Sequence, residues 1–165
     1  MSQFSSAEDS GYPKPGPRQK LLAVSSGGGH WIQLLSICTA FQDCDVTFVT
    51  THKSYRLQVN GQKFRTVTDA NLSTKFRLIK TASQLAWILL TEQPDIVIST
   101  GAAPGYFALR LGRLMGAKTI WLDSIANVDQ LSVSGLKIGP SADLWLTQWP
   151  HLAREGGPHY VGSVL

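Results

Sequence analysis

The sequence has 165 residues, of which 43% are hydrophobic and 16% charged, and its formal net charge is +4 at pH 7. This length and composition fit one domain with a buried core. The longest apolar run, Leu85 to Leu90, is far shorter than the roughly 18 to 20 residues that a bilayer-spanning helix needs. The positive charge favours anionic partners such as phosphates, nucleotides, acidic lipids or nucleic acid.

Residues 1–19 differ in composition from the rest of the chain. Met1 to Pro17 is rich in Ser, Gly and Pro and lacks the apolar centre of a secretory signal. We expect a disordered lead-in here, followed by a single Rossmann-like domain over residues 20–165.

Apolar, β-branched runs alternate with helix-like segments after the lead-in. The expected strands are Leu21 to Ser25, Val46 to Thr51, Phe64 to Thr68, Asp95 to Thr100, Lys118 to Asp123 and Leu144 to Gln148. The expected helices are His30 to Phe41, Ser73 to Thr91, Pro104 to Met115 and a shorter one within Leu131 to Ser141. This alternation predicts an α/β fold with a doubly wound, mostly parallel sheet of about six strands. Ligands of such sheets bind beyond the carboxyl ends of the strands, so the loops there are the candidate site.

The strongest local motif is a glycine run between the first strand and the first helix, Ser-Ser-Gly-Gly-Gly-His at residues 25–30. Glycine permits a close backbone approach, and the N–H groups of a helix start attract a phosphate or pyrophosphate. His30 is expected at the mouth of this loop. The GxGxxG and Walker A patterns are absent, and a glycine turn that serves only strand-to-helix packing is the alternative. The candidate ligand residues are Ser26, Gly27, Gly28 and Gly29.

A second small-residue loop, Ser-Thr-Gly-Ala-Ala-Pro-Gly-Tyr at residues 99–106, follows the fourth strand and also opens a helix. Pro104 lies near the first helical position, where proline is favoured. We expect Gly101 and Ala102 to lie beside the first loop across a switch point of the sheet and to contact the same anion. Ordinary packing of small residues at a crossover is the alternative.

A third polar loop, Asp-Ser-Ile-Ala-Asn-Val-Asp-Gln at residues 123–130, follows the fifth strand. Asp123 is the best-placed acid, because a carboxylate there could accept a proton from a hydroxyl nucleophile. Ser124 and Asn127 are possible ligand contacts. An Asp at a strand end is as often the cap of a turn or helix, and that alternative stays open.

The expected helix from Ser73 mixes cations with large apolar side chains. The cations are Lys75, Arg77 and Lys80, and the helix becomes apolar through Trp87 and Leu90. This mixture occurs in membrane-surface elements. A core helix with a solvated basic end is the other interpretation, and the more frequent one.

The cysteines and histidines show no pattern of metal or redox chemistry. Cys38 and Cys44 match neither a CxxC pair nor a zinc spacing, which suits a reducing cytoplasm. His52, His151 and His159 have no ligand spacing. We therefore expect neither a metal nor another cofactor, and the scattered cations predict no nucleic-acid partner.

Five segments, taken in order, resemble motifs of the Alg14-like family and its bacterial exopolysaccharide members of the PssD type. They are Leu22 to Leu34, Asp95 to Gly101, Asp123 to Ala126, Leu131 to Gly135 and Gln148 to Pro150. The similarity runs from about Lys20 to the carboxyl terminus.

The resemblance implies the acceptor-side, amino-terminal half of a GT-B glycosyltransferase, akin to the first domain of the transferase MurG. In that family a separate chain binds the UDP-sugar, while the half seen here recruits it to the membrane and helps to receive a lipid diphosphate-linked acceptor. The resemblance implies that Gly27 to His30 face the acceptor diphosphate and that the loops at Gly101 and Asp123 border the same cleft. Catalysis is assigned to His30 and Asp123, and the chain alone is expected to be inactive.

Two departures from the family pattern change the expectations. Eukaryotic members begin with a membrane-anchoring helix, which residues 1–19 cannot supply, so peripheral contact at the cytoplasmic face of the membrane is expected. The family usually has Glu and then Arg where this chain has Asp123 and Asn127. The segment Tyr160 to Leu165 is expected to be a last short strand or a tail, where a fused enzyme would cross to its second domain.

Other interpretations remain. The chain could be a non-catalytic Rossmann-type module that holds a nucleotide through Gly27 to Gly29 with His52, Lys53 and Arg56. It could also be a membrane adaptor that only scaffolds its partner. Because half of the expected cleft is missing, an obligate donor-binding partner chain or a homo-oligomer is expected in the glycosyltransferase interpretation.

Overall fold

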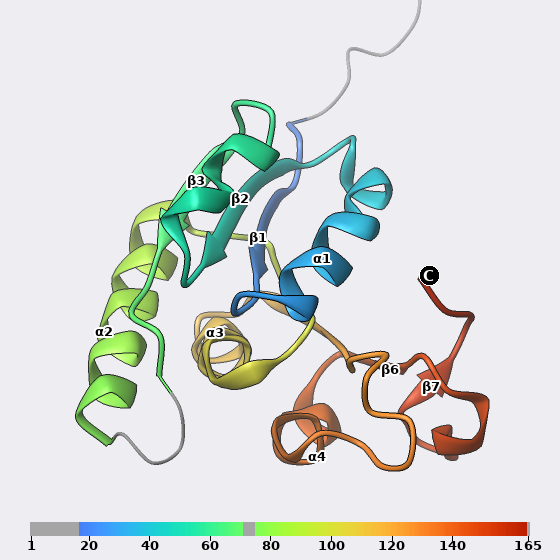
Figure 1. Cartoon of the computed structure of the whole chain (residues 1–165). Coiled ribbons are helices and arrows are strands. Elements are labelled where there is room, and N and C mark those ends of the chain that lie inside the picture. Colours follow the sequence, from blue (N-terminus) through green and yellow to red (C-terminus); the bar gives the residue numbers. More distant parts are fainter. Residues whose placement is uncertain (1–16, 71–74, 165) are drawn as a thin grey trace, which may run out of the picture.

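The computed structural model describes residues 17–70 and 75–164. Its strands form one sheet with helices on both faces (Figure 1). The strands are β1 (Lys20–Val24), β2 (Asp45–Thr50), β3 (Lys63–Thr66), β4 (Ile96–Ser99), β5 (Lys118–Leu122), β6 (Leu144–Thr147) and β7 (His159–Tyr160). The α-helices are α1 (Gly29–Ser36), α2 (Lys75–Glu92), α3 (Ala102–Leu114) and α4 (Val133–Ile138). Short 3-10 helices are η1 (Cys38–Phe41), η2 (Lys53–Gln58), η3 (Gly139–Ser141) and η4 (Pro150–Leu152).

The sheet confirms the predicted fold class. Its strand order is β3-β2-β1-β4-β5-β6-β7, and every neighbouring pair is parallel. The order reverses between β1 and β4, where Val24 lies opposite Ser99. This pair of strands is therefore the switch point at which a ligand cleft is expected. The seventh strand is only His159–Tyr160, too short for a recognisable apolar pattern.

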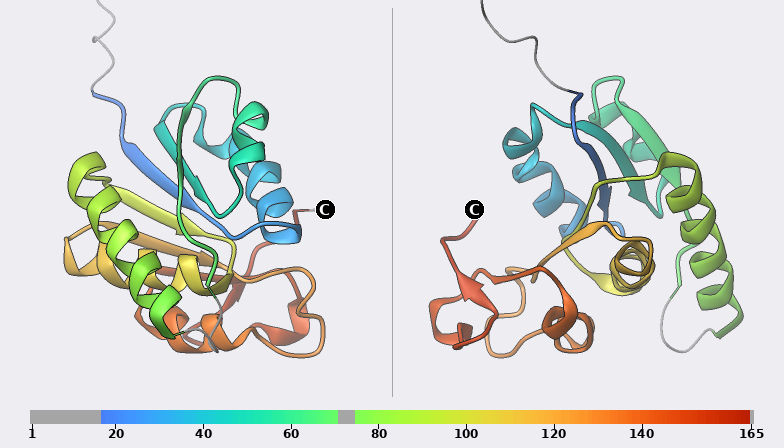
Figure 2. Two further views of the ribbon diagram at one scale, coloured as in Figure 1. Left: turned by 60° about the vertical axis from the view of Figure 1, so that its left-hand side comes forward. Right: turned by 180° about the vertical axis from the view of Figure 1, so that it is seen from behind.

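Two hydrophobic cores lie on opposite faces of the sheet. In β1, Leu22 and Val24 face the core that α2, α3 and α4 cover, while Leu21 and Ala23 face the core beneath α1. All four side chains are buried. Figure 2 shows α2 and α3 on one side of the sheet and α1 on the other. Strands apolar on both faces are what a parallel sheet between two helical layers requires.

The expected helices are present with shifted ends. The predicted helix His30 to Phe41 divides into α1 and η1 around Ile37, whose φ of −95° and ψ of 0° leave the α-helical range. Ser73, the predicted start of the second helix, lies outside the described residues, as do residues 1–16 of the expected lead-in. Within residues 17–70 and 75–164, no helix combines the length and apolar character that crossing a bilayer requires.

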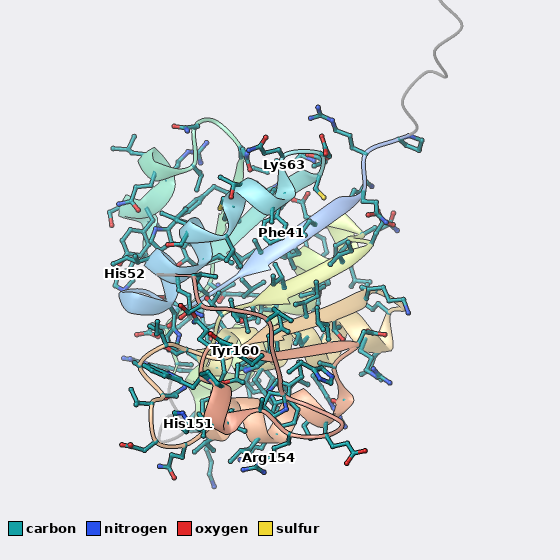
Figure 3. The ribbon with its side chains drawn as sticks, turned by 90° about the vertical axis from the view of Figure 1, so that its right-hand side faces the viewer. Phe41, His52, Lys63, His151, Arg154 and Tyr160 are labelled. Carbon is teal, nitrogen blue, oxygen red and sulfur yellow. The ribbon has the colours of Figure 1, made fainter. Side chains whose placement is uncertain are left out.

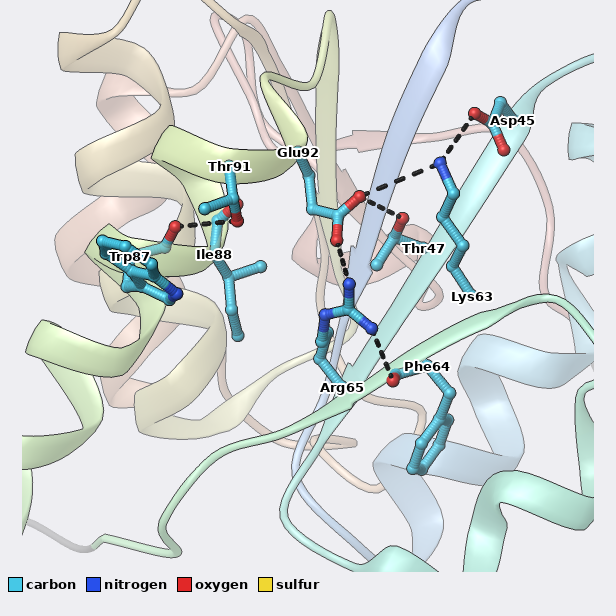
Figure 4. A network of polar contacts seen from close by, with 9 residues as sticks. All are labelled: Asp45, Thr47, Lys63, Phe64, Arg65, Trp87, Ile88, Thr91 and Glu92. Carbon is cyan, nitrogen blue, oxygen red and sulfur yellow. Dashed lines mark hydrogen bonds and ion pairs between the residues drawn. The ribbon is translucent and has the colours of Figure 1, made fainter.

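A network of polar contacts ties the edge strand β3 to the end of α2 (Figure 4). The Glu92 carboxylate accepts hydrogen bonds from Arg65 at 2.8 Å and from the Thr47 hydroxyl at 3.4 Å. Lys63 forms ion pairs with Glu92 at 3.9 Å and with Asp45 at 3.1 Å. A carboxylate in the last turn of a helix opposes the helix dipole. The two cations of β3 therefore stabilise the Glu92 carboxylate at the end of α2.

We predict that Glu92→Gln lowers the free energy of unfolding by about 1 kcal/mol, because loss of the partly buried carboxylate removes the anion that pairs with Arg65 and one of the two that pair with Lys63. Urea denaturation measures this change. Glu155→Gln, at an exposed position, is the matched control and should have no effect. Equal effects of the two substitutions would contradict the role given to the network.

Asp143, just before β6, gives a pH-dependent contact with β5. Its carboxylate accepts the backbone N–H and the hydroxyl of Thr119, both at 2.9 Å, and lies 3.3 Å from the Lys118 ammonium. These Thr119 hydrogen bonds, then Lys118, hold the pKa of Asp143 below its usual value. Asp143 therefore stabilises the fold above the unfolded-state pKa of about 3.9, and this contribution is lost as pH falls through the lower folded pKa.

We predict that Asp143→Asn flattens the fall in stability of the protein below about pH 4. Urea midpoints recorded across the acidic range, for the parent chain and the variant, measure this difference. Asp69→Asn changes an exposed carboxylate and should leave the profile as in the parent. A parent-like profile for Asp143→Asn would refute the assignment.

Candidate functional site

The loops after β1 and β4 are joined at the switch point by a reciprocal pair of hydrogen bonds. The Thr100 hydroxyl donates to the His30 carbonyl at 2.7 Å, and His30 Nδ1 lies 2.9 Å from the Thr100 carbonyl. A carbonyl oxygen only accepts, so Nδ1 carries the proton and donates. In the neutral ring Nε2 is then left with a lone pair. The prediction that these two loops lie side by side is confirmed.

Glycine is required at two positions of the first loop. Gly28 caps α1 with a φ of 66°, in the left-handed region that other residues avoid. Gly27 lies against the His52 ring, which occupies the space of a Cβ. The Gly28 N–H donates to the Tyr55 hydroxyl at 3.0 Å. The first loop thus exposes mainly backbone groups, and two side chains that follow β2, His52 and Tyr55, fix its conformation.

Tyr55 is a site residue that the sequence did not reveal. Its ring stacks on Trp31 at a centroid distance of 5.0 Å and an interplanar angle of 4°. Trp31 is fully buried and donates its indole N–H to Gln58 at 2.6 Å. Because Tyr55 belongs to η2, which has no pattern of its own, only the tertiary structure shows that it reaches the glycine loop.

The start of α3 has an unusual backbone. Gly101 has a φ of 140° and Ala102 a φ of 64°, although a side chain disfavours positive φ. The His30 ring lies over Gly101 where a Cβ would stand, and the Gly101 N–H donates to Ser99 Oγ at 3.1 Å. A strained backbone at a non-glycine residue often marks a functional site.

Asp123 lies at the centre of the third loop and is almost fully buried, with 2% of its surface exposed. One carboxylate oxygen accepts the Ser124 N–H at 2.9 Å and the Asn127 amide at 2.7 Å. The other accepts the Ser132 N–H at 3.2 Å. This geometry supports the turn-capping alternative for Asp123. Proton transfer at this carboxylate would require the loop to open.

Two buried glutamines connect this third loop to the rest of the site. Gln33 of α1 and Gln148, which follows β6, both donate to the Asp123 carbonyl at 3.1 Å. Gln33 also accepts the Ile125 N–H at 3.3 Å, and Gln148 accepts the Val164 N–H at 3.1 Å. Sequence reasoning missed the roles of these glutamines, since a lone Gln has no motif. They join α1, the third loop and the carboxyl-terminal segment.

Figure 3 shows where two of the histidines, His52 and His151, lie relative to the sheet. His52 and His151 lie toward the edge at which the strands end, and Lys63 lies toward the opposite edge (Figure 3). His52 belongs to the glycine-loop region through Gly27. His151 Nε2 lies 2.7 Å from the Val128 carbonyl, so it contacts the third loop instead.

Comparison with known protein families now assigns the chain. The family model described as "Oligosaccharide biosynthesis protein Alg14 like" matches residues 40–164, which is more than half of the sequence. The chain belongs to the Alg14-like family. The structure adds that hydrogen bonds join the loops after β1 and β4, of which the first lies before the matched range.

Curated relatives carry the name UDP-N-acetylglucosamine transferase subunit ALG14. The protein of Yarrowia lipolytica is 35% identical over 70 residues, which cover 39% of this chain and 32% of the relative. That of Debaryomyces hansenii is 28% identical over 137 residues, covering 78% of this chain and 58% of the relative. The chain thus spans only part of the length of these relatives.

Solved structures show the same fold at low sequence identity. MurG of Acinetobacter baumannii matches with a TM-score of 0.71 and 14% identity, over 89% of this chain and 46% of MurG. UDP-N-acetylglucosamine 2-epimerase of Rickettsia bellii matches with a TM-score of 0.68 and 16% identity, over 90% of this chain and 46% of the epimerase. The Rossmann-like sheet of this Alg14-like chain therefore corresponds to about half of each larger protein.

We predict that Asp123→Asn lowers the free energy of unfolding by about 1–3 kcal/mol, because an amide NH₂ would face backbone donors in a buried site. Chemical denaturation measures the change. Asp129→Asn alters an exposed carboxyl in the same loop and should be neutral. If both variants were as stable as the parent chain, Asp123 would not be the organiser of the loop.

Proposed function

We propose that this Alg14-like chain is the acceptor-binding, membrane-recruiting subunit of a two-component glycosyltransferase of polysaccharide biosynthesis. The partner chain binds a UDP-sugar, and this chain receives a lipid diphosphate-linked acceptor. The observation that carries the proposal is the pair of helix starts at Gly28 and Gly101, joined across the switch point by His30 and Thr100. Family membership and the names of the curated relatives support it.

A diphosphate suits the backbone of these two loops. The first N–H groups of α1 and α3 have no partner within their own helices, and both helix dipoles present a partial positive charge there. Neither helix has an acidic residue in its first turn. Gly27, Gly29 and Ala102 would contact the phosphates, with Ser26 beside them. Gly28 and Gly101, whose N–H groups bind Tyr55 and Ser99, would contact the phosphates by close approach of their backbone.

His30 is the residue that we assign to proton transfer. Its Nδ1–H is held by the Thr100 carbonyl, so a neutral ring offers Nε2 as the base. In the proposed step the acceptor hydroxyl attacks the anomeric carbon of the donor sugar. Its proton passes to Nε2 as the bond to UDP breaks. Asp123, Ser124 and Asn127 act indirectly in this proposal, by fixing the loop that borders the cleft.

The one-sided site supports the part of the proposal that gives the donor sugar to a separate subunit. The three loops of the candidate site all lie at the carboxyl ends of the strands of one sheet. Transfer requires donor and acceptor to be held together away from water. The MurG likeness covers 46% of that chain, which leaves room for a second half. We place this assembly at the cytoplasmic face of a membrane, where a lipid-linked acceptor is anchored.

The test is sugar transfer from UDP-N-acetylglucosamine to a lipid diphosphate-linked sugar by this chain alone, by its candidate partner alone and by the co-purified pair. We predict turnover only with the pair. His30→Ala should lower kcat about 100-fold or more, in line with loss of a general base, and leave the complex intact. His159→Ala changes an exposed histidine of β7 and should retain activity.

Other results would refute specific parts of the proposal. Full activity of the complex that carries His30→Ala would indicate that this chain only scaffolds its partner. Turnover by the partner alone would remove the need for this subunit. Tight, saturable nucleotide binding by this chain alone, without a complex, would favour the Rossmann-type nucleotide-binding module.

A further inference from the structure

Helix α2 has two apolar faces, of which the sheet covers only one. Leu85, Ile88 and Leu89 are buried in the core shared with α3. On the opposite side lie large apolar side chains with 60–90% of their surface exposed. These residues, Phe76, Ile79, Trp87 and Leu90, define the outer stripe of α2. At 100° per residue they fall within one third of the helix circumference, centred away from the core.

The charges around the outer stripe have one sign. Lys75 flanks it on one side, while Arg77 and Lys80 lie on the other, as the helical period requires. The single acidic residue of α2 is Glu92, which is already paired with Arg65. The outer stripe is therefore an apolar strip between cations, and it complements a surface that is apolar inside and anionic outside.

A hollow of about 540 Å³ opens between α2 and the edge strand β3. Trp87 and Ile88 supply its apolar wall, and Arg65 and Thr66 supply the wall on β3 (Figure 4 shows Arg65, Trp87 and Ile88). The helical period places this hollow on the same side of the outer stripe as Lys80. A polar headgroup could enter here beside an apolar ring and a guanidinium.

The direction of α2 places its basic end at the same edge of the sheet as the candidate site. The helix connects β3 to β4 in a parallel sheet, so it runs antiparallel to the strands and begins at their carboxyl edge. The loops of Gly28 and Gly101 lie at that same edge. Figures 1 and 2 show α2 outermost on its side of the sheet, with its first turn toward the edge where α3 begins.

We infer that the outer stripe of α2 and the adjoining hollow dock the protein on an anionic phospholipid bilayer. The apolar side chains enter the headgroup region, and Lys75, Arg77 and Lys80 pair with lipid phosphates. The helix lies in the plane of the surface, and the glycine loops face the membrane-anchored acceptor. This inference rests on the proposed function and deepens it by naming the surface that makes the membrane contact.

The experiment is co-sedimentation of the purified chain with vesicles. Vesicles of phosphatidylcholine mixed with phosphatidylglycerol should bind the chain, and vesicles of phosphatidylcholine alone should bind it at least about tenfold less. Binding should fall as salt is raised. Ile79→Ser combined with Trp87→Ser should lower the partition coefficient about tenfold or more. Arg77→Gln combined with Lys80→Gln should lower it by about tenfold.

Matched controls change equally exposed residues elsewhere. Leu57→Ser with Leu114→Ser removes apolar side chains that are 91% and 77% exposed, and Lys137→Gln with Arg154→Gln removes two exposed cations. Both should bind vesicles like the parent chain. Denaturation midpoints identify any variant that fails to fold, and a second pair, Phe76→Ser with Leu90→Ser, then replaces it.

Three outcomes would overturn the inference. They are absence of vesicle binding, binding without preference for anionic lipid, and binding that the α2 variants and the controls reduce equally. A dimer in size-exclusion chromatography that Trp87→Ser dissociates, without vesicle binding, would assign the outer stripe to a second copy instead. The assay contains no donor, partner or sugar transfer, so its failure is distinguishable from failure of the proposed transferase activity.

Discussion

The contact on which the candidate site depends is the exchange of hydrogen bonds between His30 and Thr100. These residues are 70 positions apart in sequence, and only the parallel pairing of β1 with β4 brings them together. The His30 ring can rest there because Gly101 has no side chain. One packing relation thus sets the tautomer of His30, the approach of two helix starts and the conformation at Gly101 and Ala102.

The third loop joins this arrangement mainly at the Asp123 carbonyl. Two glutamines from different elements converge on the Asp123 backbone oxygen, and each binds a further backbone N–H. Buried amides of this kind fix geometry because both their donors and their acceptors need partners. Movement of the segment around Val164 would therefore displace Gln148 and the Asp123 carbonyl, and through Gln33 it would affect α1.

Much of the fold was predictable because its strands are apolar on both faces and their runs stand out. The predicted strands agree with β1 to β6 within about two residues. The two glycine loops were predictable as well, since a run of small residues between a strand and a helix is typical of a close backbone approach. The expected last strand or tail over Tyr160 to Leu165 overlaps β7 only at Tyr160. The break at Ile37 depends on tertiary context and left no trace in the pattern.

The side chains that hold the loops were harder to predict. Tyr55, Gln33 and Gln148 reach backbone groups that lie far away in sequence, and no local motif encodes such contacts. For Asp123 the sequence left a base and a cap as equal alternatives, and burial favours the cap. In α2 both faces are apolar, so periodicity alone could not tell the covered face from the exposed one.

The candidate phosphate site consists of peptide groups rather than side chains. A systematic alanine scan would therefore pass over its centre, because replacing one side chain by another leaves the peptide N–H in place. At Gly28 such a change would report backbone strain, and at Gly27 the displacement of His52. Amide-to-ester replacement in the first turns of α1 and α3, or the chemical shifts of those amide protons, would probe the groups themselves. A site of this kind tolerates substitution of the surface side chains around it, because the peptide N–H groups stay in place.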